Sequence, residues 1–311
     1  MDGSIEINAA VTLSSLTRSS RFDLTSTYFL VAGISGIDPN IGTLGDVTFA
    51  HYAVQVALQY EIDPRELPAN FSTGYIPFGT KAPVQYPQSI YGSEVYELNQ
   101  NLQHLAAKWA RKVTLNDTTA AQAYRANYAP DYGASAFGPR VRECDVATSD
   151  VYYHGNLLSG SFADFFALMT NSSATYCTTA QEDNATLEAL LRAAKDEVVD
   201  FSRIMIMRTA SNFDRPYSGQ SAAQSLLSAE SGGFGPAVEN MYRAGSIVVH
   251  GILEGWNGTF AQGVNATNYV GDILGSLGGE PDFGPYGDGS VPVTSESRKR
   301  DAMAKRGLSV G

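Results

Sequence analysis

Apolar runs alternate along the chain with segments in which apolar residues recur every three or four positions. The continuous run "YFLVAGISGI" (28–37) and the alternating segment "GTLGDVTFAHYAVQVALQYEI" (42–62) predict β-strands. The helical spacing predicts helices over residues 93–113, 184–198 and 235–256. Short strands that alternate with amphipathic helices indicate an α/β fold, with a largely parallel or mixed sheet covered on both faces and ligands bound beyond the strand ends.

The same pattern bears on domain organisation. The sequence shows no internal repeat and no interdomain linker, and 311 residues with 43% hydrophobic content can bury one large core or two ordinary ones. After Gly287 the apolar period is lost in a segment that contains "SRKRDAMAKRG". We therefore expect a single domain over residues 1–287 and a mobile C-terminal tail over residues 288–311.

Charge and hydropathy argue against several kinds of partner. The chain has 32 acidic and 21 basic residues, a net charge of -11, and no dense cluster of Lys and Arg, so we expect no binding to nucleic acid. Its most apolar stretches are shorter than the ~20 residues of a membrane-spanning helix. His51, His104, His154 and His250 lack metal-ligand spacing, so no metal site is expected. No GxGxxG follows a strand, and we expect no cofactor.

The cellular compartment is left open by the sequence. The start "MDGSIEINAA" lacks the pattern of a signal peptide. N-glycosylation sequons favour a secreted or cell-surface protein over a cytoplasmic one, although abundant Asn, Ser and Thr could also produce them by chance. The sequons lie at Asn70, Asn116, Asn171, Asn184, Asn257 and Asn265. Cys144 and Cys177 could form a disulfide or remain buried thiols.

The evidence for each candidate catalytic residue is weak when its motif is taken alone. Ser35 lacks the GxSxG context of a hydrolase nucleophile. The acidic segment "QED" (181–183) could simply favour the dipole of the helix that follows it. The segment "RTASNFDRP" (208–216) follows the apolar run "RIMIM" and predicts a polar loop at the tip of a buried strand.

The order of these segments resembles the nucleoside phosphorylase superfamily and, more closely, the fungal purine nucleoside permeases. "GSIEINAA" (3–10) is similar to the family's Gly-rich turn that ends in Asn-Ala-Ala, and residues 28–50 are similar to its strand, glycine turn and "GD" strand. "CDVATSDVYYHG", "AQEDNATLEAL" and "RTASNFDRP" resemble its Ser-Gly-Asp-x-Phe, Glu-Met-Glu and Arg-x-x-Ser-Asp segments. The resemblance covers nearly the whole chain and implies a three-layer fold with a central mixed sheet flanked by helices.

The resemblance also implies roles for individual residues. Tyr152 stands where the family stacks an aromatic ring on the purine, and Asp183 aligns with the carboxylate that binds the ribose hydroxyls. Glu182 takes that role if the alignment is one residue off. Asn212 falls where the family meets purine N7, and Asp214 is expected to act behind it.

Four further residues are implied to bind substrate by their place in the family's motifs. They are Ser35 and Gly36 in the glycine turn, and Ser149 and Asp150 in the segment before the aromatic ring.

Departures from the family pattern refine the expected chemistry. Val31 stands where phosphorylases commonly have a phosphate-binding Arg, and Asn212 replaces an Asp that could deliver a proton. Ile5 replaces a Gly of the turn. Relatives also begin with a strand and loop ahead of the Asn-Ala-Ala turn, so we expect the N-terminal strand to be missing from this sequence, as in a truncated gene model.

Three hypotheses about function follow. The protein cleaves the N-glycosidic bond of purine nucleosides, with hydrolysis favoured over phosphorolysis; or it binds nucleosides and assists their uptake without chemistry; or it is a scaffold whose site has decayed. Because relatives assemble so that a neighbour completes the site, we expect a homo-oligomer.

Overall fold

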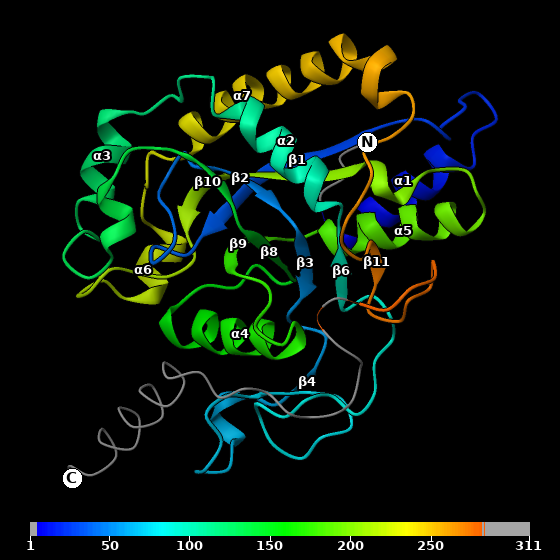
Figure 1. The fold of residues 1–311 in the computed structure, drawn as a ribbon. Coiled ribbons are helices and arrows are strands. Elements are labelled where there is room, and N and C mark those ends of the chain that lie inside the picture. Colours follow the sequence, from blue (N-terminus) through cyan, green and yellow to red (C-terminus); the bar gives the residue numbers. More distant parts are fainter. Residues whose placement is uncertain (1–4, 282, 284–311) are drawn as a thin grey trace.

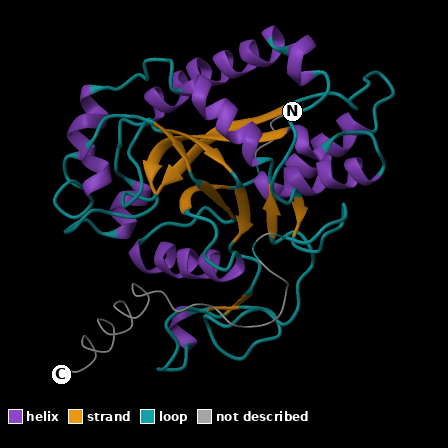
Figure 2. Ribbon diagram, viewed as in Figure 1, coloured by secondary structure: helices purple, strands orange, loops and turns teal. Residues whose placement is uncertain are grey.

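The structure, a computed structural model, describes residues 5–281 and 283. Its centre is a nine-stranded mixed sheet in the order β11-β6-β3-β8-β9-β1-β10-β2-β7 (Figures 1 and 2). The strands of this sheet are β1 (Phe29–Ile37), β2 (Val47–Ala50), β3 (Tyr52–Gln55), β6 (Val95–Glu97), β7 (Val141–Glu143), β8 (Asp145–Thr148), β9 (Tyr176–Ala180), β10 (Ile204–Phe213) and β11 (Gly271–Asp272). A separate small sheet pairs β4 (Tyr60–Glu61) with β5 (Tyr75–Ile76). Residues 288–311, the expected tail, lie outside the described residues.

Helices cover both faces of the large sheet. They are α1 (Glu6–Thr17), α2 (Gln100–Ala110), α3 (Thr119–Arg125), α4 (Asn156–Met169), α5 (Asp183–Lys195), α6 (Ala222–Leu227) and α7 (Phe234–Glu254), with short helical turns at Pro64–Glu66, Gly133–Ala136, Phe201–Arg203 and Trp256–Phe260. In the part of the chain that the structure describes, no helix combines the length and hydropathy of a membrane span.

Alternation along β10 shows how the layers form. Met205 and Met207 pack in the apolar cluster under α2 and α7, whereas Ile204 and Ile206 pack in the cluster under α5. A third cluster, which includes Phe166, packs α4 on the sheet face opposite α5. Helices on one face, the sheet, and helices on the other face make three layers, so the expected three-layer mixed α/β fold is confirmed.

The predicted strand and helix segments are found with changed boundaries. Residues 28–37 form β1, residues 42–62 contain β2, β3 and β4, and the helices expected over 184–198 and 235–256 are α5 and α7. The prediction for residues 93–113 is wrong over its first part, because Val95–Glu97 is a strand held between β3 and β11. The helix α2 begins only after Asn99, whose side chain accepts a hydrogen bond from the amide of Leu102.

The end of β10 also differs from the prediction. The strand does not stop after "RIMIM" but continues to Phe213, because β1 pairs with it in parallel as far as Ile37, with a bulge between Ser35 and Gly36. Ser211 and Asn212 therefore lie on the strand, and the loop begins at Asp214. The other edge of β1 pairs with β9 only at Gly36 and Ile37, so the sheet opens along the rest of β1.

The two cysteines, whose state the sequence left open, form a disulfide. Cys144 and Cys177 are both buried, with 5.8 Å between their Cα atoms. Cys144 directly precedes β8 and Cys177 lies near the start of β9, so the bond links the beginnings of two neighbouring strands in the middle of the sheet.

Candidate functional site

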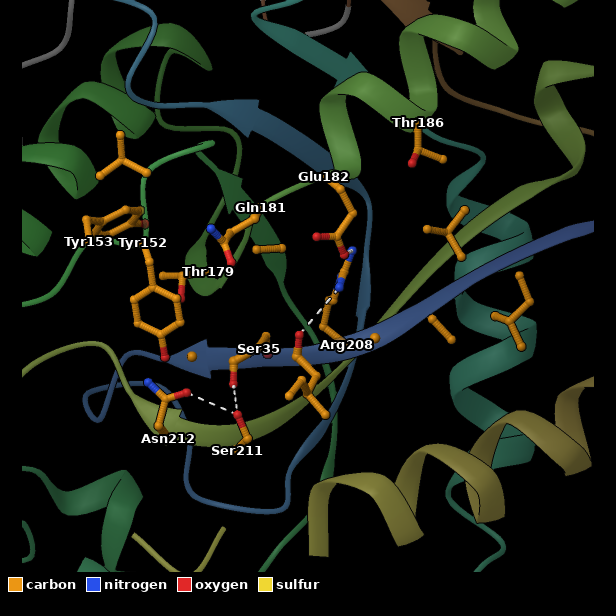
Figure 3. Close-up of a pocket in the computed structure, with 18 of the residues that line it drawn as sticks. Ser35, Tyr152, Tyr153, Thr179, Gln181, Glu182, Thr186, Arg208, Ser211 and Asn212 are labelled. Carbon is orange, nitrogen blue, oxygen red and sulfur yellow. Dashed lines mark hydrogen bonds and ion pairs between the residues drawn. The ribbon is translucent and has the colours of Figure 1, made fainter. Parts of the chain in front are cut away.

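A cavity of about 580 Å³ lies where the sheet opens beside β1. Ligand pockets commonly have volumes of this size. Its polar and aromatic walls come from the ends of β1, β9 and β10, the segment after β8, and the start of α5 (Figure 3). These side chains are Ser35, Tyr152, Tyr153, Thr179, Gln181, Glu182, Thr186, Arg208, Ser211 and Asn212. The wall toward α1 is apolar and is formed by residues such as Leu13, Phe29 and Val31.

Tyr152 and Asn212 face each other across one end of the cavity. The Tyr152 hydroxyl points toward the Asn212 amide and the end of β1 (Figure 3). Burial raises the pKa of Tyr152, and a hydrogen bond with Asn212 opposes that rise. Tyr152 as a whole residue is 54% exposed, so part of its surface is open to a ligand.

Hydrogen bonds at the end of β10 orient the Asn212 amide. Its Oδ1 accepts from the Ser211 hydroxyl at 3.0 Å, and its Nδ2 donates to the carbonyl of Phe213 at 3.1 Å. The Ser211 hydroxyl also lies 3.1 Å from the carbonyl oxygen of Ser35, which links β10 to β1. Because an amide nitrogen carries two hydrogens, one goes to Phe213 and the second serves the hydrogen bond with Tyr152.

Glycine is required at Gly36 by close packing. A Cβ atom at this position would overlap the Thr179 hydroxyl oxygen, and it would also approach the Asn212 amide nitrogen. Gly36 thus lets β1, β9 and β10 converge at the end of the cavity.

A buried arginine and two carboxylates form the opposite end of the polar region. Arg208 donates to both carboxylate oxygens of Asp183, through Nε at 3.0 Å and through Nη2, and Nη2 also lies 2.6 Å from Oε1 of Glu182. Burial acts to lower the pKa of Arg208, but the charges of Asp183 and Glu182 outweigh it and the pKa is raised. Burial also raises the pKa of Asp183, although Arg208 opposes that shift. The guanidinium fits because residue 33 is glycine, where a Cβ atom would overlap it.

The cavity brings together five of the candidates from the sequence: Ser35, Gly36, Tyr152, Glu182 and Asn212. Asp183 is fully buried behind Arg208 and does not line the cavity, so its carboxylate does not face the space where a sugar could lie.

Ser149, Asp150 and Asp214 are also absent from the cavity walls. The hydroxyl of Ser149 accepts from the amide of Val151 at 3.1 Å, and Oδ1 of Asp150 accepts from the amide of Glu6 at 3.2 Å. Asp214 is buried and paired with Arg215, and its expected role behind Asn212 stays a prediction.

Sequence reasoning missed several wall residues, chiefly Arg208, Gln181 and Ser211. All of them stand inside the motifs quoted above, "QED" and "RTASNFDRP", so the motifs themselves were the available signal. Within residues 5–281 and 283, no group of three or more His, Cys, Asp or Glu side chains is arranged to hold a metal ion.

Solved structures with a similar chain path include two bacterial 5'-methylthioadenosine/S-adenosylhomocysteine nucleosidases. The enzyme from Neisseria meningitidis has a TM-score of 0.46 and 14% identity, covering 81% of this chain and 79% of that chain. The enzyme from Helicobacter pylori has a TM-score of 0.41 and 15% identity, covering 79% of this chain and 76% of that chain.

Sequence comparison gives a closer match. The family model described as purine nucleoside permease matches residues 1–265. A purine nucleoside permease of Candida albicans is 47% identical over 287 residues, covering 91% of this chain and 70% of the relative. A probable purine nucleoside permease of Schizosaccharomyces pombe is 38% identical over 258 residues, covering 80% of this chain and 74% of the relative. The chain therefore belongs to the purine nucleoside permease family.

Proposed function

We propose that the cavity binds a purine nucleoside and that the protein cleaves its N-glycosidic bond by hydrolysis. The observation that carries the proposal is the convergence of Tyr152, Asn212 and Glu182, from three separate segments, on one cavity. The names of the Candida and Schizosaccharomyces relatives support a purine nucleoside as the ligand.

The end of the cavity formed by Tyr152 and Asn212 suits a purine base. The Tyr152 ring offers an apolar face on which a flat base can stack, while its hydroxyl stays hydrated. In this proposal, N7 of the purine takes the Asn212 amide hydrogen that otherwise serves the Tyr152 hydroxyl. Pyrimidines have no N7, so this arrangement favours purines.

The end formed by Glu182 suits the sugar. A carboxylate accepts strong hydrogen bonds from hydroxyl groups, and its negative charge favours the positive charge that develops at the anomeric carbon. The ion pair with Arg208 fixes the position of Glu182. Because Asp183 is fully occupied by Arg208, the role that the resemblance gave to Asp183 passes in this proposal to Glu182.

Water is favoured over phosphate as the nucleophile. In the described part of the chain, Arg208 is the single basic side chain on the cavity wall, and it is already paired with two carboxylates. A phosphate dianion would lose its hydration with few donors to replace it, which costs several kcal/mol. In the proposed step the water oxygen bonds to C1′ and gives one of its protons to solvent, and the electron pair of the C1′–N9 bond leaves with the purine, which takes its proton from solvent. Turnover is slow, because Asn212 stabilises the leaving base but cannot protonate it.

Calorimetry followed by an activity assay tests the proposal. Inosine and adenosine are expected to bind much more tightly than uridine, and inosine is expected to release hypoxanthine and free ribose at a rate that depends little on phosphate. Glu182→Gln should slow release, whereas Glu66→Gln, at an exposed acid outside the cavity, should not. Accumulation of ribose 1-phosphate would overturn the hydrolytic reaction. Binding without release of base would leave a nucleoside-binding protein, and equal or absent heats for all three nucleosides would overturn the proposal.

A further inference from the structure

Behind the cavity, buried polar side chains form one connected chain of hydrogen bonds. The hydroxyl of Tyr153, a cavity wall residue, lies 3.1 Å from the hydroxyl of Tyr176, which donates to Oδ2 of Asp214 at 2.8 Å. Arg215 donates to both oxygens of Asp214 at 2.8 and 2.9 Å, and its Nη2 lies 3.1 Å from Oδ2 of Asp38. These five residues, here called the Asp214 cluster, are each at most 8% exposed.

The directions of these hydrogen bonds are fixed by the ion pair. A carboxylate paired with an arginine can only accept, so Tyr176 must donate to Asp214, and the remaining bond then runs from Tyr153 to Tyr176. Burial raises the pKa of Tyr153 and of Tyr176, so both hydroxyls keep their protons. A chain with a single direction holds the Tyr153 ring in a single orientation.

The Asp214 cluster joins the segments that shape the purine end of the cavity. Asp38 follows β1 directly, Asp214 stands two residues after Asn212, and Tyr153 is the neighbour of Tyr152. The backbone carbonyl of Asp214 also accepts from the amide of Gly155 at 3.0 Å and from the hydroxyl of Ser159 at 2.9 Å, which holds the start of α4. The segment that carries Tyr152 is therefore tied to the strand that carries Asn212.

We propose that the Asp214 cluster is a positioning device for purine recognition, which sets the distance and angle between the Tyr152 ring and the Asn212 amide. Tyr176 and Asp214 are positioning residues in this proposal, since they act on a ligand only through Tyr153 and its neighbours. The inference rests on the proposed function, because it takes the ligand of the cavity to be a purine nucleoside. The alternative hypothesis is that the Asp214 cluster only stabilises the fold, a role that buried ion pairs can also have.

Two matched substitutions separate positioning from stability. Tyr176→Phe removes one buried hydroxyl from the Asp214 cluster, and Tyr96→Phe removes one from a fully buried tyrosine that donates to Glu188 at 2.6 Å, away from the cavity. Both variants should lose similar stability. Only Tyr176→Phe should raise the Kd for inosine, by about 5–10-fold, the usual net contribution of one hydrogen bond. Equal Kd values for the two variants would overturn the proposal.

A double-mutant cycle measures whether the Tyr153 and Tyr176 hydroxyls affect inosine binding together, which a purely structural role does not predict. Tyr153→Phe should weaken inosine binding as much as Tyr176→Phe, and the double variant should be no weaker than either single one, because both changes break the same chain. Losses that add would show that the two hydroxyls act separately, against the proposal.

Hydrogen exchange in the ligand-free protein separates this proposal from the proposed function. If the wild-type protein does not bind inosine, the proposed function fails, but the coupling can still be measured. Amides of residues 150–155 should exchange faster in Tyr176→Phe than in the wild type or in Tyr96→Phe. Unchanged exchange in this segment would overturn the positioning role whatever the ligand.

Discussion

At the scale of single residues, Asn212 is the side chain whose loss should affect chemistry most directly. One hydrogen of its amide goes to Phe213, and in the proposed function the other passes from Tyr152 to the leaving purine, which gains negative charge as the bond breaks. We expect Asn212→Ala to slow the release of hypoxanthine from inosine by ~10-fold or more, judged from a lost hydrogen bond of roughly 1.5–3 kcal/mol. Steady-state rates, with thermal unfolding as the control for folding, check this. An unchanged rate in a folded variant would remove Asn212 from the mechanism.

Loss of charge at two neighbouring carboxylates should have unequal effects on stability and on activity. Asp183 is buried and bound to Arg208 through both oxygens, so Asp183→Asn breaks a buried pair and should lower the free energy of unfolding by about 3 kcal/mol or more. The side chain of Glu182 is 20% exposed, so Glu182→Gln should cost ~1 kcal/mol or less while slowing release of base. Urea unfolding and activity measured on both variants check the contrast, which a reversed order would contradict.

The same pair shows how far the site could be predicted from the sequence. The motifs located the right segments, and Tyr152, Asn212, Ser35, Gly36 and Glu182 all line the cavity. They could not decide between residues 182 and 183. Side chains of successive residues at a helix start point about 100° apart, so an alignment shifted by one residue assigns the cavity-facing role to a side chain that points into the core.

The role of Arg208 was less accessible still. It depends on two carboxylates 25 and 26 residues earlier in the chain, and only the fold brings the three side chains together.

At the scale of elements, periodicity predicted what was strongly patterned. The helices α5 and α7 and the strand β1 were found from their spacing, whereas the helix α1, with the sequence "EINAAVTLSSLT", was not predicted. Its Thr, Ser and Val residues have modest helix propensity, and the helix is stabilised by packing against α5, which is a tertiary effect. The strand β6 was wrongly predicted as helix because a local sequence pattern carries no information about its pairing with β3 and β11, which is also a tertiary effect.

The attachment of α1 should depend on pH through Glu6. The side chain of Gln55 donates to Glu6, and burial, followed by the charge of Asp150, raises the pKa of Glu6 to about 7. Since the ordinary pKa is 4.5, the folded state binds the proton more tightly, and this contribution is complete below pH 4.5 and lost as pH rises through about 7. We therefore expect α1 to loosen between about pH 5.5 and 8.

Hydrogen exchange of α1, with rates corrected for the intrinsic effect of pH, measures this loosening. Glu6→Gln should abolish the pH dependence, and Glu66→Gln, at an exposed acid, should leave it intact. If the exchange of α1 still depends on pH in Glu6→Gln, a group other than Glu6 causes the pH dependence.

At the scale of the whole molecule, the outer face of α7 bears on assembly. Val238, Tyr242, Val249 and Leu253 follow one another at helical spacing and are 45–73% exposed. Contiguous apolar surface of this kind often marks an interface. The homo-oligomer expected from the sequence stays a prediction, and light scattering should give a dimer or larger species that Tyr242→Glu weakens. Phe22→Glu, at another exposed aromatic residue, serves as the control, and a wild-type monomer would contradict the expectation.

The sequons and the disulfide bear on the compartment in which the molecule folds. A disulfide between Cys144 and Cys177 is typical of an oxidising compartment, where N-glycosylation also takes place. The sequons differ in their exposure to solvent in the folded protein. Asn70, Asn171, Asn257 and Asn265 are exposed, whereas Asn184 is 2% exposed and its amide nitrogen donates to the carbonyl of Ser93 at 2.7 Å.

The burial of Asn184 makes the expected glycosylation pattern specific. A glycan on its amide nitrogen would remove the hydrogen bond to Ser93, and the buried start of α5 has no room for the sugar. We expect glycosidase treatment of native protein to lower its mass, and peptide mapping to find glycans at exposed sequons and none at Asn184. Asn184→Gln should therefore leave the glycosylated mass unchanged apart from the residue itself, while Asn265→Gln should lower it by one glycan. A native protein whose mass does not respond to the enzyme, with both cysteines as free thiols, would favour the cytoplasm and make the sequons accidental.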